Sequence, residues 1–196
     1  MSQGGNMSEE VAKGVNFVFA KEYIIDKHGE STWNKAVARL SEEHAKVWTG
    51  VLVPFGTYSF PAFKAMVHAV SEESGARDDR ELARMYEYIA DRSLNAVYKI
   101  FFRFANPSFV ISNYPKLWSR FFTAGKVTVS KAEKGFAQIR FELPEMFLDW
   151  LGPACLGYSN KAVTMSGGRD VLVEEQVRRR IADDDWEVDF QIRWSE

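Results

Sequence analysis

The strongest constraint on the fold is a strict alternation near the C-terminal end of the chain. Five large apolar residues alternate with charged or polar ones: Trp186, Val188, Phe190, Ile192 and Trp194. Successive side chains of a strand point to opposite faces of a sheet. The pattern therefore predicts a strand with one buried face and one face in water.

Apolar residues at every second position also predict two antiparallel hairpins. Four apolar residues before the last strand keep its odd-numbered phase: Val171, Val173, Val177 and Ile181. Residues 182–185 would form the turn between the two strands. Upstream, an alternating segment at 126–130 and a turn at 133–135 precede a second alternating run: Ala137, Ile139, Phe141 and Leu143. A helix from Pro144 would join the hairpins, and we expect Gly152 and Pro153 to kink or split it.

The first third of the chain has helical periodicity instead. Ser8 is a candidate N-cap for a helix that ends at His28 and Gly29, with Gly29 in the left-handed conformation. This helix is apolar on two sides, which predicts burial between other elements. Its main apolar face would be Val11, Val15, Val18, Phe19 and Ile25, with Phe17 and Ile24 on another side. A second helix would begin at Ser31, and residues 1–7 would form a disordered tail.

Further helices are marked by their capping residues. Ser41 and Ser59 are candidate N-caps, and Gly75 is a stop signal. Asp78 and Glu81 form a candidate capping box for a helix that could run to about residue 104. The second half of that helix, 94–104, is apolar on nearly every side, as in a core helix or a cavity wall. A shorter helix would span 113–125.

These patterns predict an α+β fold, in which an N-terminal helical half precedes a small antiparallel sheet built as hairpin, helix and hairpin. We expect residues 8–196 to form one domain, because 196 residues suit a single core. Hydrophobic residues make up 46% of the chain and aromatic residues 14%, a composition typical of a folded domain.

Composition also narrows the partners and the compartment. A net charge of −2 does not favour nucleic acid as a partner. One cysteine cannot form an intramolecular disulfide, which fits a reducing cytoplasm. The first residues show no signal-peptide pattern, and no run reaches the length of a membrane span. We therefore expect a cytoplasmic protein.

The sequence contains no pattern that indicates catalysis. It has no glycine-rich phosphate loop and no motif for a metal centre or an activated serine. Cys155 would be a nucleophile only beside a histidine, so a buried structural thiol is the better interpretation. The three histidines, His28, His44 and His68, lack metal-ligand spacing. We expect no enzyme and no metal site.

Several segments resemble the haem-NO-binding (H-NOX) domain and its haem-free relatives. KGVNFVFAKEYIIDKHGESTW at 13–33 is similar to the opening of that family, ANPSFV at 105–110 to its entry into the sheet, and DFQIRW at 189–194 to its last strand. The same superfamily includes 4-vinyl-reductase ligand-binding domains and the TRAPP vesicle-tethering subunits. The segments LSEEHAKVW and NYPKLWSRFFTAG also resemble a myxobacterial family of this type. The resemblance implies the fold and a role in bacterial ligand sensing.

The sequence departs from the haem-binding pattern at both anchors of haem. In the H-NOX family a histidine on the long central helix ligates iron, and a Tyr-x-Ser-x-Arg motif holds the propionates. This chain has no histidine after His68, so the matching region offers only Tyr98. The sheet segment AQIRFELPE contains Arg140 without the Tyr-x-Ser part. The resemblance therefore implies no haem cofactor.

The first hypothesis is a haem-independent sensor for an apolar small molecule, such as a fatty acid, an isoprenoid or a tetrapyrrole. Its cavity would lie between the first helix, segment 94–104 and the sheet, with these candidate lining residues: Phe17, Tyr98, Phe102, Trp118 and Arg140. The second is an interaction or tethering module with a solid core, working as a homodimer or with a signalling partner. The third is an atypical haem or NO sensor that uses His44 or His68.

Overall fold

The computed structural model describes residues 11–98 and 106–196, with the side chains of 95–98 excluded. The predicted tail 1–7, the Ser8 cap and Phe102 lie outside these ranges. The described chain forms two compact units. Unit 1 comprises the chain up to Glu81 together with 120–123, and unit 2 comprises 82–119 and 124–196.

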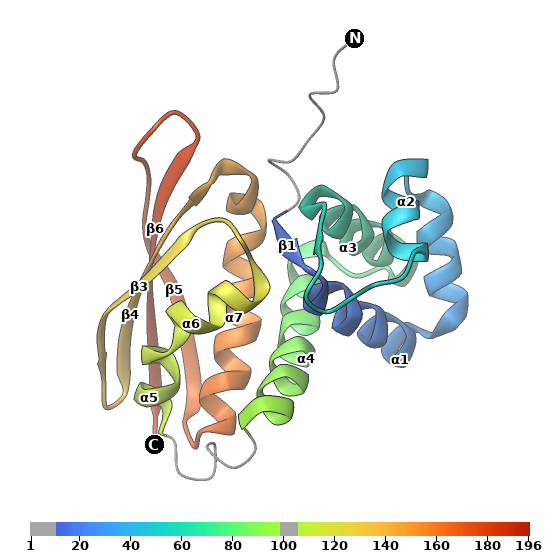
Figure 1. Cartoon of the computed structure of the whole chain (residues 1–196). Coiled ribbons are helices and arrows are strands. Elements are labelled where there is room, and N and C mark those ends of the chain that lie inside the picture. Colours follow the sequence, from blue (N-terminus) through green and yellow to red (C-terminus); the bar gives the residue numbers. More distant parts are fainter. Residues whose placement is uncertain (1–10, 99–105) are drawn as a thin grey trace. The chain divides into compact units, whose positions relative to one another are not determined.

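Unit 1 is helical and has one small sheet. Strand β1 (Ala12–Lys13) pairs antiparallel with β2 (Thr57–Tyr58). The helices are α1 (Gly14–Arg39), α2 (Glu42–Thr49), α3 (Phe60–Ser74) and the first turn of α4 (Asp78–Tyr98). Figure 1 shows these elements in blue to green. The prediction that the first helix begins after Ser8 is wrong, because pairing with β2 keeps residues 12 and 13 extended.

Capping explains where the middle helices begin. The Ser41 hydroxyl accepts a hydrogen bond from the His44 amide at 3.2 Å, and the Ser59 hydroxyl accepts one from the Ala62 amide at 3.3 Å. Gly75 ends α3 with φ 68° and ψ 16°, in the left-handed conformation. These bonds satisfy amide groups that a helix end leaves unpaired. The predicted caps at Ser41, Ser59 and Gly75 are confirmed.

Helix α1 differs from its prediction in two ways. Gly29 has a non-helical backbone at which two helical segments meet in a kink, so the predicted break at His28 and Gly29 is confirmed, but its φ of 82° and ψ of 164° are not the predicted left-handed helical conformation. The buried residues of α1 include Phe17, Ala20 and Ile24, whereas Val18 and Phe19 are only half-buried. The predicted main face is therefore wrong. The helix has apolar residues on both sides, and the packing around Phe17 determines which side is more buried.

Unit 2 combines a four-stranded antiparallel sheet with helices. The sheet order is β3 (Lys126–Glu133), β4 (Phe136–Pro144), β6 (Asp185–Ser195) and β5 (Arg169–Arg180). Helices α5 (Pro107–Ser112) and α6 (Tyr114–Phe121) precede it, and the short η1 (Glu145–Phe147) leads into α7 (Leu148–Met165). In Figure 1, α6 and α7 lie on the same side of the sheet. The predicted α+β fold is confirmed.

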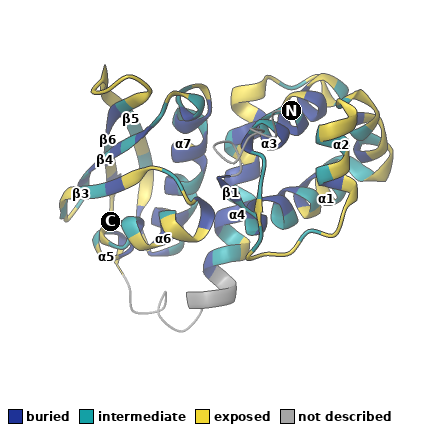
Figure 2. Cartoon of the chain, turned by 45° about the horizontal axis from the view of Figure 1, so that its top comes forward, coloured by how far each residue is buried: buried dark blue, intermediate teal, exposed yellow. Residues whose placement is uncertain are grey.

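The sheet buries one face as the alternation predicts. Ala137, Ile139, Phe141 and Leu143 of β4 are buried, as are Val188, Phe190, Ile192 and Trp194 of β6. Figure 2 shows the contrast between buried and exposed positions along these strands. The four residues of β4 face the helices, because the ring of Trp118 on α6 lies 5.4 Å from the ring of Phe141.

Two further elements of unit 2 differ from their predictions. Helix α7 is one helix that includes Pro153, so the predicted alternative of a split is wrong, and buried residues lie on both sides of this proline, including Leu151 and Ala154. In β5, a bulge between Glu175 and Val177 shifts the register so that Val177 pairs with Asp189. The bulge moves Val177 to the outer face of the sheet, where its exposed fraction is 37%.

Candidate functional site

The predicted lining residues are divided between the two units. Phe17 belongs to unit 1, whereas Trp118 and Arg140 belong to unit 2. The side chains of Tyr98 and Phe102 lie outside the described residues. The two units are therefore considered in turn, beginning with the aromatic groups that the prediction places beside a ligand.

Phe17 is the centre of an aromatic cluster in unit 1. Its side chain is fully buried, and its ring centroid lies 4.7 Å from that of Trp48, 5.2 Å from that of Tyr58 and 5.4 Å from that of Phe63. The Trp48 indole N–H donates to the Ala62 carbonyl at 2.8 Å, which fixes the orientation of that ring. Spacings of this size are those of packed aromatic side chains. Phe17 therefore lies within a filled core.

Trp118 belongs to a second aromatic cluster, in unit 2. Besides Phe141, it packs on Phe147 at 5.8 Å and on Trp150 at 6.3 Å between ring centroids. Its indole N–H donates to the Ala124 carbonyl at 2.9 Å. Trp118 is half-buried, so part of its surface remains open.

Arg140 faces away from Trp118, on the outer face of the sheet. Its guanidinium group donates two hydrogen bonds of 2.8 Å to the Asp189 carboxylate and also lies 3.0 Å from a Glu187 oxygen. Arg179 pairs with the other Glu187 oxygen at 2.6 Å. The alternation predicts that this face lies in water, but Asp189 and Glu187 on it are only 4% and 6% exposed. The bidentate bond to Asp189 raises the pKa of Arg140.

Cys155 and its neighbours form a buried polar group in unit 2. The Cys155 sulfur lies 3.7 Å from the Ser159 hydroxyl, to which the Tyr114 hydroxyl donates at 3.0 Å. Burial raises the pKa of the Cys155 thiol to about 12. The raised pKa keeps the thiol protonated at neutral pH, and the thiolate is the reactive form. This environment does not activate a nucleophile.

The histidines lie in unit 1, and two of them contact carboxylates of α4. The His28 ring N–H donates to Glu81 Oε1 at 2.7 Å, and the Glu81 side chain is fully buried. The predicted capping box at Asp78 and Glu81 is therefore wrong, because the Glu81 carboxylate points into unit 1. A signal was present in the sequence: Glu81 falls four and eight residues before Met85 and Ile89, which are buried.

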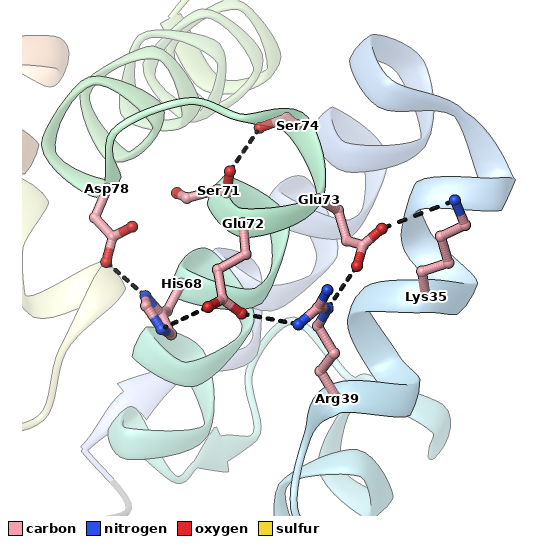
Figure 3. Close-up of polar contacts among 8 residues, drawn as sticks. All are labelled: Lys35, Arg39, His68, Ser71, Glu72, Glu73, Ser74 and Asp78. Carbon is pink, nitrogen blue, oxygen red and sulfur yellow. Dashed lines mark hydrogen bonds and ion pairs between the residues drawn. The ribbon is translucent and has the colours of Figure 1, made fainter.

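His68 belongs to an exposed network of charges, which Figure 3 shows across α1, α3 and the start of α4. Its Nδ1 lies 2.9 Å from Asp78 Oδ2, and its Nε2 lies 3.7 Å from Glu72. Arg39 continues the network, because it pairs with Glu72 at 3.2 Å and also with Glu73. The predicted exposure of His68 beside the α3 stripe is confirmed. His44, on α2, is half-buried.

Within residues 11–98 and 106–196, no group of three or more potential ligands from histidine, cysteine, aspartate and glutamate could hold a metal ion. In the same ranges, no helix is long and apolar enough to cross a membrane.

Comparison by sequence finds no relative: no protein-family model and no curated protein matches the chain. Comparison by structure gives matches over nearly the whole length. The unliganded Fe(II) H-NOX protein from K. algicida is 18% identical and has a TM-score of 0.67, covering 94% of this chain and 97% of that one. A mutant of T. tengcongensis H-NOX is 12% identical at a TM-score of 0.69, covering 94% of this chain and 98% of that one.

A third match is an oxygen-binding H-NOX domain related to soluble guanylate cyclases. It is 13% identical with a TM-score of 0.69, and the match covers 94% of this chain and 95% of that one. Identities this low establish the fold and nothing finer. The chain therefore has the H-NOX fold.

Proposed function

We propose that this chain is a non-enzymatic, cytoplasmic sensing domain of bacterial signalling that binds an apolar small molecule without haem. The observation that carries the proposal is the H-NOX fold over 94% of the chain. The matched structures include one that binds oxygen. Ligand binding within the fold is therefore the first function to test.

The absence of haem rests on the residues at the two family anchors. No histidine follows His68 in the sequence, so α4 supplies no imidazole for iron. His28 and His68 each already engage a carboxylate. Arg140, which would correspond to the propionate-binding arginine, binds Asp189 on the outer face of the sheet. These residues do not fit haem in the way that the family holds it.

Addition of haemin to the purified protein tests this part of the proposal. We expect no stoichiometric Soret band, because α4 contains no histidine and both His28 and His68 already contact carboxylates. If a band forms, H44A and H68A variants identify whether either histidine binds the iron. A stoichiometric band in the parent protein would overturn haem independence, and its loss in one variant would support the atypical haem sensor.

Native mass spectrometry with palmitate, farnesol and protoporphyrin IX tests the ligand class. We expect a one-to-one adduct with at least one of these probes, retained at micromolar concentration. W118F is the informative variant, because Trp118 is a half-buried candidate, and W48F is its control, because Trp48 lies wholly within the other cluster. Absence of every adduct would remove the sensing function.

An interaction module is the second candidate, and one observation favours it. In the segment 51–55, the exposed fraction is 88% for Val51 and 92% for Phe55. The segment is nevertheless braced, since the Val53 amide donates to the Tyr58 hydroxyl at 2.8 Å and the Gly14 amide donates to the Gly56 carbonyl at 2.8 Å. Exposed apolar side chains on a fixed backbone are typical of binding surfaces.

Light scattering after size-exclusion chromatography tests the second candidate in its homodimeric form. We expect a dimer that V51S/F55S converts to a monomer. The control L156S changes another exposed apolar residue, Leu156 on α7, and should leave the mass unchanged. A monomeric parent protein would remove the homodimer.

A further inference from the structure

The first turn of α4 is held by histidines from two other helices. His68 of α3 bonds to Asp78, and His28 of α1 bonds to Glu81. All four residues belong to unit 1, whereas α4 from Leu82 onward belongs to unit 2. This turn is therefore the point at which the chain passes from one unit to the other along a single helix.

The inner pair is buried. The Glu81 side chain is 0% exposed and the His28 side chain 18% exposed, with 2.7 Å between His28 Nε2 and Glu81 Oε1. The second carboxylate oxygen, Oε2, has no hydrogen-bond partner among the described residues. The Tyr23 ring packs edge-on against the His28 ring at 5.7 Å. When a buried carboxylate has one hydrogen-bond partner, removal of that partner strongly destabilises the fold.

The outer pair is exposed to solvent. The His68 and Asp78 side chains are 62% and 58% exposed. Glu72 on α3 and Arg39 on α1 are the other charged groups that face His68 (Figure 3). The hydrogen bond to Asp78 and then the Asp78 charge raise the pKa of His68, and Glu72 adds to this, while desolvation and Arg39 oppose it.

The direction of this shift fixes the direction of the pH dependence. A histidine whose folded pKa is raised contributes its full stabilisation below the unfolded value of about 6.5. That contribution is lost as the pH rises through the folded pKa of His68. The outer pair therefore holds the turn most strongly under mildly acidic conditions and less strongly under alkaline conditions.

We propose that the first turn of α4 is a proton-responsive joint, in which the buried contact of His28 with Glu81 fixes the turn and the exposed contact of His68 with Asp78 adjusts it. Loss of the His68 proton loosens the outer contact, between His68 and Asp78. The joint thus gives the chain a response to pH that requires no bound ligand and is separate from the proposed sensing function.

Hydrogen–deuterium exchange of the full chain tests this joint. The readout is the protection of amides 79–84, corrected for the intrinsic dependence of exchange on pH. We expect protection to be about two- to fivefold greater at pH 6 than at pH 8.5, the size of an exposed ion pair. H68N and D78N should each abolish the difference, and H44N, which changes a histidine outside the joint, should retain it.

A variant of the inner pair completes the design. H28N should lower the protection of the same amides at both pH values, because it removes the hydrogen bond to the buried Glu81 carboxylate. A pH response that survives in H68N, or a parent protein with equal corrected protection at pH 6 and 8.5, would overturn the proposal. Because H68N and D78N alter exposed side chains, both should fold, and a ring NMR titration of His68 in the parent protein provides a check that needs no variant.

Discussion

Replacement of His28 by leucine offers the sharpest test of how unit 1 is held together. His28 provides the hydrogen bond to a carboxylate that is 0% exposed, and Glu81 Oε2 already lacks a partner. Removing one member of a buried pair costs about 3 to 5 kcal/mol. Since the His28 side chain is 18% exposed and the pair is therefore not fully buried, the lower end applies, about 3 kcal/mol.

That loss corresponds to a fall in melting temperature of about 6 to 12 °C for a chain of this size. The double variant H28L/E81L should recover most of this loss and lie within about 1 kcal/mol of the parent protein, because the buried carboxylate is then absent together with its partner. The control H44L should change the free energy of unfolding by less than about 0.5 kcal/mol.

Urea unfolding followed by far-UV circular dichroism and tryptophan fluorescence measures these differences. The double-mutant cycle should give a coupling energy of about 2 kcal/mol between His28 and Glu81. The reasoning is refuted if H28L unfolds at the same urea concentration as the parent protein. It is also refuted if the two single-variant losses simply add in H28L/E81L, since the carboxylate would then not depend on the histidine.

Three further predictions concern the backbone and the thiol. An ideal Cβ at Gly157 would lie 2.0 Å from the Ala83 carbonyl oxygen, whereas at Gly152 it would meet nothing within 4 Å. G157A should therefore lower the urea midpoint sharply or prevent folding. G152A, in the same helix, should increase the free energy of unfolding by up to about 1 kcal/mol. G29A should destabilise the protein by about 1 to 3 kcal/mol, because φ 82° and ψ 164° suit glycine alone, and equal midpoints for G29A and the parent protein would contradict this. The Cys155 thiol, with its pKa raised to about 12, should react with a disulfide reagent at pH 8 only after unfolding, so rapid labelling of the native protein would be inconsistent with its burial.

Several predictions succeeded because the relevant interactions are local. The hydroxyl groups of Ser41 and Ser59 each bond to an amide three residues ahead, so neighbouring sequence suffices to identify them. The alternation in β4 and β6 marks the buried face of each strand, since side-chain direction in a strand depends only on position. The order of these elements, helices first and sheet second, was likewise readable along the chain.

The burial of Glu81 shows why other predictions failed. In the sequence, Asp78 and Glu81 have the spacing of a capping box, which is a local interaction. In the structure, Glu81 bonds to a residue 53 positions away and Asp78 bonds to His68. A local cap and a long-range ion pair compete for the same carboxylate, and only the packing of α1 against the start of α4 decides between them.

The same distinction applies to the candidate site. Phe17 and Trp118 were chosen as aromatic residues in predicted helices, and the structure places them in separate units, each within an aromatic cluster. Arg140 was chosen for its position in a strand, and its register opposite Asp189 turns it to the outer face. Strand pairing is set by residues far apart along the chain, so a single sequence cannot supply it.

The amino-acid sequence was sufficient to identify the helix starts at Ser41 and Ser59, the alternation of β4 and β6, and the α+β class. The tertiary structure alone decided which side of α1 is buried, where the β5 bulge turns Val177 outward, and which carboxylates the histidines contact. Helix caps and strand alternation depend on backbone geometry over a few residues. The features that only the tertiary structure shows depend on which apolar surfaces, far apart in the sequence, are buried against each other.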